Sequence, residues 1–324
     1  RSSPTVTAAG APTAAPETTP SPAPAPIAAP GATPPPAAQN PSPMMETTRA
    51  HGRIAPHVPS TRRVMLEGIL SRPVELHLPP GAPTVGSFDL LIHFLGPAFL
   101  AVDAARAVDS SMVVAVVNLA PGSSAYERPF RDAGAWRALL DRVTNEVGVA
   151  RGAPQTLGGV YLSAFSAGNG AVRAILADSA ALPSIRGVVI LDGIHTGYLP
   201  DRRVLADSGQ LDPANLQSLR RFAERAVRGE VRMLVSHSEV FPGTFASTTE
   251  TANWLLHELA LSREAVLAWG PNGMQQTSMI RAGGFTLMGF AGNSAPDHLD
   301  HLHALPTWLG RVVAPDPREA LKAR

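Results

Sequence analysis

The sequence predicts one α/β domain with a mostly parallel central sheet flanked by helices, and three observations lead to this prediction. Strand-like and helix-like runs alternate from residue 62 to residue 313. Two of the strand-like runs, FDLLIHF (88–94) and MVVAVVNL (112–119), are almost continuously apolar, which is typical of parallel strands buried on both faces. The globular part, roughly 270 residues, is near the upper size limit of a single core.

The first half of the domain begins with two short strands. Arg63–Ile69 and Val74–Leu78 are separated by a polar turn and are followed by Pro79, Pro80 and Gly81. We expect them to form an antiparallel edge of the sheet. The next predicted elements are a strand at 88–94, a helix at 98–108, a strand at 112–119, a helix at 133–147, a strand at 160–166 and a helix at 167–176.

The second half continues the alternation. The predicted elements are a strand at 187–191, a helix at 212–227, a strand at 231–236, a helix at 247–261, a strand at 285–291 and two closing helices at 297–305 and 307–312. Ser247 precedes Glu250 by three residues, which is the spacing of a capping box.

Two flanking segments lie outside this pattern. The first 43 residues are rich in Pro, Ala, Ser and Thr and carry only the charges of Arg1 and Glu17. Such a composition has too little apolar bulk to offset the entropy of ordering the chain. We therefore expect a disordered Pro/Ala/Thr-rich linker at 1–48, a folded α/β domain at 49–314 and a fraying tail at 315–324.

Composition excludes several classes of function. The net charge of +1 does not indicate a nucleic-acid partner, and the absence of cysteine excludes disulfides, thiolate catalysis and zinc–thiolate sites. No apolar run reaches the ~18 residues of a membrane-spanning helix. The chain begins at Arg1, so we expect an export signal to have been removed before that residue. A Pro/Ala/Thr spacer before a folded domain is typical of bacterial secreted or surface-tethered proteins.

The segment GGVYLSAFSAGNGAVRAI (158–175) contains the most informative motif. A strand-like run ends at Ser166 and a helix-like run follows at once. Ala164 and Gly168, two residues before and after the serine, are small. A chain that turns sharply from strand to helix needs small residues there, because the turn folds the backbone against itself. The turn exposes the serine hydroxyl.

This motif resembles the nucleophile elbow of the α/β-hydrolase family, with Ala164 where most members have glycine. The resemblance extends over residues 62–313, through the order of the predicted elements. It implies an α/β-hydrolase fold and a serine nucleophile, followed in the chain first by a carboxylate and then by a histidine. No cofactor is expected.

The expected histidine follows the last strand. The segment GNSAPDHLDHLHALP contains His298, His301 and His303. His298 fits best, since it lies just beyond the turn-forming residues, and His301 is the alternative on the same helix face. Asp297, His298, Asp300 and His301 also have metal-like spacing, but nothing else in the sequence completes a ligand set. We therefore predict no metal.

Two carboxylates compete for the role of the acid. Glu239 follows the strand at 231–236, which is the family's usual position, and Asp192 follows the strand at 187–191, a position that some lipases use. We prefer Glu239 slightly. The test is which carboxylate reaches the histidine Nδ1.

The resemblance also implies an oxyanion hole. One donor is the backbone N–H of Ala167, the residue after the nucleophile. The other is expected in the loop after FDLLIHF, where His93-Phe94-Leu95-Gly96 is similar to the HGxG loop of esterases. Phe94 and Leu95 are the candidates, since Pro97 has no N–H to donate.

We therefore expect a secreted or cell-surface serine hydrolase that cleaves small-molecule or polymeric carboxylic esters through a Ser-His-Glu/Asp triad and an acyl-enzyme. A peptidase or amidase on the same fold is one alternative. Another is a non-catalytic surface binding module with a hydrolase-like fold. The sequence is silent on the acyl and alcohol groups and on the oligomeric state.

Overall fold

The computed structural model describes residues 38–39, 42–45, 51–80 and 86–313. These residues all belong to one compact unit of the chain. Most of the predicted linker (1–48) and the predicted tail (315–324) lie outside the described residues.

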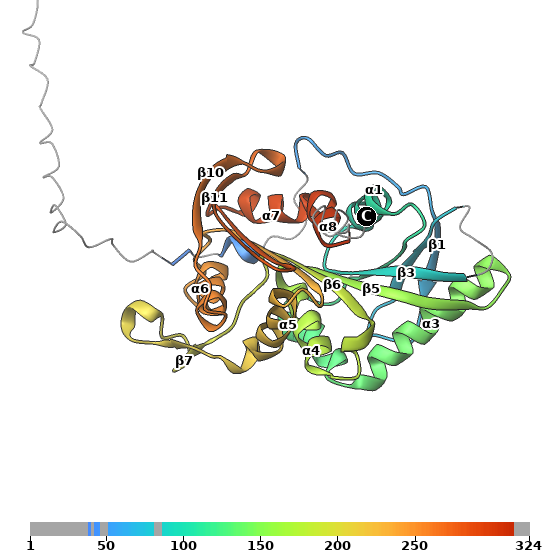
Figure 1. The fold of residues 1–324 in the computed structure, drawn as a ribbon, viewed down its shortest axis with the longest axis horizontal. Coiled ribbons are helices and arrows are strands. Elements are labelled where there is room, and N and C mark those ends of the chain that lie inside the picture. The colour runs from blue at the N-terminus through green and yellow to red at the C-terminus, as the bar shows by residue number, and fades with distance from the viewer. Residues whose placement is uncertain (1–37, 40–41, 46–50, 81–85, 314–324) are drawn as a thin grey trace, which may run out of the picture. The chain divides into compact units, whose positions relative to one another are not determined.

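A ten-stranded sheet forms the centre of this unit (Figure 1). Its strand order is β1-β2-β4-β3-β5-β6-β9-β12-β11-β10. The strands are β1 (Arg62–Leu66), β2 (Val74–Leu78), β3 (Gly86–Phe94), β4 (Val113–Val117), β5 (Gln155–Phe165), β6 (Ile185–Leu191), β9 (Arg232–His237), β10 (Glu264–Trp269), β11 (Gln275–Ala282) and β12 (Phe285–Phe290). A small second sheet pairs β7 (Tyr198–Leu199) with β8 (Gln210–Leu211).

The central strands run parallel and the edges run antiparallel. From β4 through β3, β5, β6 and β9 to β12, every pairing is parallel. At one edge β1 and β2 pair antiparallel with each other, and β2 pairs antiparallel with β4. The antiparallel opening edge predicted from the sequence is therefore confirmed. The fold class is confirmed as well, since this is a large, mostly parallel sheet flanked by helices.

Helices cover both faces of the sheet, with a separate apolar core on each side. In Figure 1 the helices α1 (Ala98–Val108), α7 (Ala295–His303) and α8 (Leu305–Val313) lie above the sheet. The helices on the opposite side are α2 (Ser123–Phe130), α3 (Ala133–Arg151), α4 (Asn169–Ala177), α5 (Gln217–Val227) and α6 (Thr248–Glu258). Short 3₁₀ turns are η1 (Pro43–Met45), η2 (Ser166–Gly168), η3 (Leu182–Ser184), η4 (Leu205–Asp207), η5 (Ala214–Leu216) and η6 (Pro271–Gly273).

Burial on two faces explains why the central strands have no polar face. All five residues of β4, VVAVV, are buried. Their side chains alternate between the two cores, so that Val113 and Ala115 face one helical layer while Val114 and Val116 face the other. The parallel strands therefore bring their carboxyl ends to one edge of the sheet, which is where this fold class positions ligand sites.

Two elements of the sheet were not predicted. Strands β10 and β11 form a hairpin that extends the sheet beyond β12. Their residues are exposed or half-buried. The apolar run AVLAW in β10 is short and QQTSMIRA in β11 is mostly polar, so neither was recognised as a strand of the sheet. Helix α2 was also missed, because its sequence SSAYERPF is mostly polar and contains Pro129.

A short segment before the expected domain boundary packs on the compact unit. The backbone N–H of Gln39 donates to the Phe241 carbonyl (3.0 Å), and the N–H of Phe241 donates to the Gln39 side-chain oxygen (3.2 Å). The turn η1 follows and lies beside α7, with Met44 buried. We call residues 38–39 and 42–45 the N-terminal strap. Part of the predicted linker therefore contributes to the globular unit.

Among the described helices, none combines the length and the apolar character needed to cross a membrane.

Candidate active site

Ser166 lies at the sharp corner between β5 and the turn η2. Its φ is +48°, a value that costs a residue with a side chain about 1–3 kcal/mol and is often found at functional sites. Gly168 fits here because an added Cβ would collide with the Phe94 carbonyl. At Gly193 an added Cβ would lie 2.7 Å from the Ser166 carbonyl oxygen. The close approach of backbone segments therefore requires the small residues that the sequence shows.

His298 lies in the first turn of α7, which begins with a capping box formed by Ser294 and Asp297. Its imidazole is fully buried and its Nδ1 lies 2.7 Å from Oδ2 of Asp192. The ring packs against Phe165, the residue before Ser166, with 4.4 Å between ring centroids. Nε2 is buried and has no hydrogen-bond partner among the described residues. With Nδ1 as the donor to Asp192, Nε2 is left as a free proton acceptor.

Asp192 ends strand β6 and accepts hydrogen bonds on both carboxylate oxygens. Oδ1 accepts from the Ser238 N–H (2.8 Å) and the Thr248 hydroxyl (2.7 Å), and Oδ2 accepts from the Ser238 hydroxyl (2.7 Å) in addition to His298. Burial alone raises the pKa of Asp192, but the attraction of His301 and the hydrogen bonds and charge of His298 lower it well below its ordinary value. The carboxylate is therefore ionised and held in one orientation.

Glu239 lies elsewhere, although the sequence slightly favours it as the acid. Its side chain is exposed, and its backbone N–H donates to the Gly292 carbonyl (2.9 Å). The chain leaves β9 through Ser238, which turns its N–H and hydroxyl toward Asp192 and leaves the next residue facing solvent. The geometry corrects the preference, because Asp192 contacts His298 and Glu239 does not.

The other two histidines of α7 have different partners. His301 Nδ1 lies 2.8 Å from the Ser236 hydroxyl, and the ring meets Phe290 edge to face. Burial lowers the pKa of His301 to about 4, so this ring is neutral near pH 7. His303 Nδ1 contacts the Leu299 carbonyl in its own helix (3.0 Å). The geometry therefore favours His298 over His301 as the base.

The expected oxyanion donors differ in their availability. Leu95, with φ +69°, donates its N–H to the Val117 carbonyl (3.1 Å), and Gly96 donates to the side chain of Asn118 (2.9 Å). Phe94 ends a strand that is paired on both sides. Ala167 directly follows the serine and lines the cavity beside it. Ala167 thus fits the expectation, whereas the amide of Leu95 is already occupied.

A cavity of about 580 Å³ adjoins Ser166. Its walls are mainly apolar and include side chains from the N-terminal strap and from the ends of β3, β4 and β5; among them are Met44, Leu95, Leu119, Tyr126 and Phe245. His195, Arg173 and Asn215 add polar groups to one wall. A mostly apolar pocket with a few converging polar groups is the usual form of a small-molecule site.

Sequence reasoning missed several residues of this site. Ser238 and Thr248 fix Asp192, and Tyr126 and Arg173 line the cavity. The one available signal was Arg173, a lone charge in the apolar helix AVRAIL. Within the residues that the structure describes, no three or more His, Asp or Glu side chains come together as a metal site.

Comparisons with known proteins identify structural similarity only. No protein-family model matches the sequence, and no curated protein matches it. Several solved structures are similar to parts of the fold. A truncated carbohydrate esterase from gut microbiota is 9% identical, with a TM-score of 0.46 and coverage of 78% of this chain and 96% of that one.

Two further structures are similar at the same level. A thermostable esterase is 13% identical, with a TM-score of 0.44 and coverage of 81% of this chain and 62% of that one. The thermophilic esterase Est2 from the planctomycete Thermogutta terrifontis is also 13% identical, with a TM-score of 0.44 and coverage of 82% and 98%.

Proposed function

We propose that this chain is a serine hydrolase that cleaves carboxylic esters, with Ser166 as nucleophile, His298 as base and Asp192 as the orienting acid. One observation carries the proposal. Ser166 occupies a strained corner on a cavity wall, and the buried Asp192–His298 pair packs on the adjacent Phe165. A serine hydroxyl becomes a useful nucleophile only beside such a base.

The acylation step follows from these roles. Nε2 of His298 takes the proton from the Ser166 hydroxyl as Oγ bonds to the acyl carbon. Asp192 stabilises the imidazolium because its ionised oxygen faces Nδ1 at 2.7 Å. When the tetrahedral intermediate collapses, the bond to the alcohol oxygen breaks and His298 donates its proton to the leaving alcohol. Ser166 then carries the acyl group as an ester.

Deacylation repeats the same proton transfers with water. His298 takes a proton from a water molecule that attacks the acyl carbon, and it returns this proton to Oγ as the acid leaves. The base is regenerated in the same tautomer, since Asp192 accepts a hydrogen bond from Nδ1 throughout.

Two donors stabilise the oxyanion in this proposal. One is the Ala167 N–H. The other is the Tyr126 hydroxyl, which lines the same cavity. Its oxygen accepts the Leu119 N–H (3.1 Å) and its proton makes no hydrogen bond to a described residue. Burial raises the pKa of Tyr126, so the hydroxyl keeps its proton. Tyr126 thus replaces the Leu95 amide, which the Val117 carbonyl occupies.

Steady-state hydrolysis of p-nitrophenyl butyrate tests the proposal. Ser166→Ala and His298→Ala should each lower kcat by at least about 1,000-fold, because both act in the same step. His301→Ala is the matched control on the same helix and should retain a kcat within about tenfold of wild type. Loss of hydrolysis in His301→Ala but not in His298→Ala would overturn the assignment of the base.

A further inference from the structure

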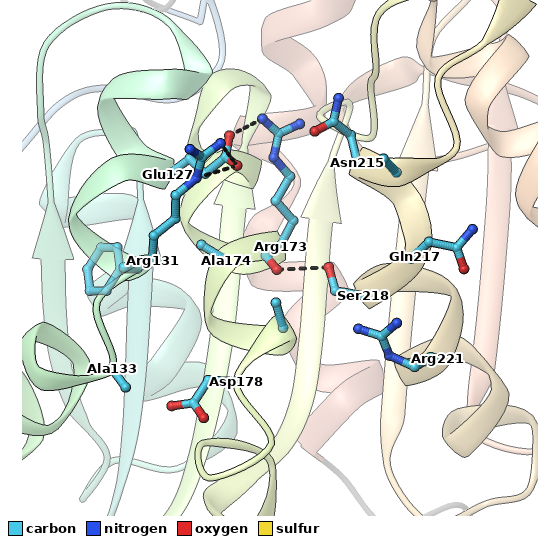
Figure 2. Close-up of a pocket in the computed structure, with 13 residues that line it drawn as sticks. Glu127, Arg131, Ala133, Arg173, Ala174, Asp178, Asn215, Gln217, Ser218 and Arg221 are labelled. Carbon is cyan, nitrogen blue, oxygen red and sulfur yellow. Dashed lines mark hydrogen bonds and ion pairs between the residues drawn. The ribbon is translucent and has the colours of Figure 1, made fainter.

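Arg173 lies in the wall between two cavities. It lines the Ser166 cavity and also a second cavity of about 440 Å³, together with Asn215, which borders both. Figure 2 shows the second cavity, with the Arg173 guanidinium between Glu127 and Asn215. Arg173 is on α4, the helix that follows the Ser166 corner. The path from Ser166 to Arg173 follows the 3₁₀ turn η2 and the first turn of α4, which corresponds to a rise of roughly 10–12 Å. A short chain is therefore long enough to connect a group at Ser166 with one at Arg173.

The charges around Arg173 leave a positive excess. Glu127 is one carboxylate shared by two guanidinium groups, since Oε1 accepts from Arg131 (2.7 Å to Nη2) and Oε2 accepts from Nη2 of Arg173. Burial raises the pKa of Glu127, but its bonds to Arg173 and Arg131 bring the pKa below its ordinary value, so it carries one full negative charge. The second cavity also contains Asp178 and Arg221, which offset each other in formal charge.

Arg173 has one donor without a partner among the described residues. Its side chain is 10% exposed, and its Nε is buried with no hydrogen-bond partner among the described residues. A buried guanidinium N–H is costly when it is unpaired, so an acceptor brought to Arg173 by a ligand would lower that cost. A carboxylate suits a guanidinium best, because the two planar groups form paired hydrogen bonds.

The neighbouring groups on this wall add no second positive charge. Desolvation lowers the pKa of His195 to about 4, and the charge of Arg173 acts in the same direction. His195 is therefore neutral near pH 7, with its Nδ1 at 2.7 Å from the Gly193 carbonyl. Asn215 is tied to Asp212 (3.1 Å) through its amide nitrogen. Within this wall, recognition of an anion depends on Arg173.

We propose that Arg173 binds a carboxylate on the substrate, so that the preferred esters carry an anionic group separated from the scissile carbonyl by a short apolar chain. This inference rests on the proposed function of Ser166. The cavity that contains both residues has a mostly apolar lining, which includes Leu119 and Phe245 and suits the intervening chain. The substrate carboxylate belongs either to the acyl group or to the alcohol group of the ester. The Arg173 guanidinium binds a carboxylate in the same way in either case.

The test compares matched ester pairs. For the acyl side, the pair is the mono-p-nitrophenyl ester of octanedioic acid and its terminal methyl ester, which is neutral. For the alcohol side, the pair is the butyrate of 4-hydroxybenzoic acid and that of methyl 4-hydroxybenzoate. We expect kcat/KM to be at least tenfold higher for the anionic member of one pair, mainly through a lower KM. That pair identifies the side that carries the charge.

Variants assign the preference to Arg173. In Arg173→Gln the ratio of kcat/KM between the anionic and neutral esters should fall to about one. The double variant Glu127→Gln/Arg173→Gln should give the same ratio, and it avoids leaving the Glu127 carboxylate without its Arg173 partner. Arg221→Gln is the control, because Arg221 is exposed and lines the second cavity but not the Ser166 cavity. It should keep the wild-type ratio.

The outcomes separate this inference from the proposed function. Hydrolysis of the neutral esters by wild type, lost in Ser166→Ala, with no preference for either anionic ester would overturn the role of Arg173 alone. A preference that survives in both Arg173 variants would also overturn it. Absence of hydrolysis of all four esters would overturn the proposed function.

Discussion

At the scale of single residues, the site depends on two positions in unusual backbone conformations. Ser166 and Asp192 both have positive φ, +48° and +42°, and each lies at the carboxyl end of a neighbouring parallel strand. The Asp192 carboxylate is enclosed by donors from Ser238, Thr248 and His298. Strain of this kind persists only where the surrounding contacts hold it, and here those contacts also orient the imidazole.

The choice of acid gives a prediction at this scale. Asp192→Asn keeps the shape of the side chain but removes the charge that holds Nδ1 protonated, so we expect kcat to fall about 1,000- to 10,000-fold. Glu239→Gln changes an exposed side chain and should leave kcat within about twofold. Ester hydrolysis by both purified variants, with circular dichroism as the check on folding, measures this. Equal losses in the two variants would contradict the role of Asp192.

Tyr126 gives a second prediction at this scale. Tyr126→Phe removes the proposed oxyanion donor, and a single such donor contributes about 100-fold to kcat. KM should change little, since the donor acts on the charge that develops in the transition state. Steady-state kinetics separate the two parameters. A rise in KM with unchanged kcat would assign Tyr126 to substrate binding only.

At the scale of elements, the parallel strands gather the site and the N-terminal strap closes one of its walls. The proposed serine, acid and base come from the ends of β5 and β6 and from the first turn of α7. The strap adds Ser42 and the methionines of η1 to the cavity. Met44 is buried there, and burial of a methionine side chain contributes about 1.5–3 kcal/mol.

Removal of the strap therefore gives a prediction. A chain that begins at residue 46 loses the Met44 wall, so KM for p-nitrophenyl octanoate should rise about five- to tenfold while KM for the acetate changes less. A chain that begins at residue 36 keeps the strap and should match the full sequence. Michaelis constants for the two esters provide the measurement. Identical constants in both shortened chains would exclude the strap from substrate binding.

The elements also show what the sequence could and could not predict. Helix α1 and strand β2 have the predicted bounds, because apolar periodicity determines both. The hairpin of β10 and β11 was missed because neither the exposed edge strand β10 nor the mostly polar β11 alternates between apolar and polar residues. The sequence could not decide whether Asp192 or Glu239 is the carboxylate that contacts the histidine, since each follows one of two adjacent strands. Only the turn at Ser238 determines which of them faces His298. Pairing of Arg173 with Glu127 joins residues 46 positions apart, which no local pattern shows.

At the scale of the whole molecule, buried histidines couple stability to pH. Burial lowers the pKa of His93, His237 and His301 to about 4, whereas an unfolded chain has histidine pKa values near 6.5. Between these values the unfolded state binds protons that the folded state does not. Stability therefore falls as the pH falls from about 6.5 to about 4. Asp192, whose pKa is lowered in the folded state, adds a further loss below about pH 4.

Denaturant unfolding across this range checks the coupling. His301→Gln should reduce the drop in the free energy of unfolding between pH 6.5 and pH 4 by about 1–3 kcal/mol, since one pKa unit is worth about 1.4 kcal/mol. His257→Gln is the control, because the His257 side chain is exposed. The drop should be unchanged in this variant.

The predictions of secretion and of a surface tether concern residues that the structure does not describe, and they stay predictions.

The most direct test of the proposed site is covalent labelling with a fluorophosphonate, followed by mass spectrometry of the labelled peptide. The reagent reacts with a serine only where a neighbouring base activates it. We expect one adduct on Ser166 in the wild-type protein and in His301→Ala, and none in Ser166→Ala or His298→Ala. An unlabelled wild-type protein, or an adduct on another serine, would contradict the account.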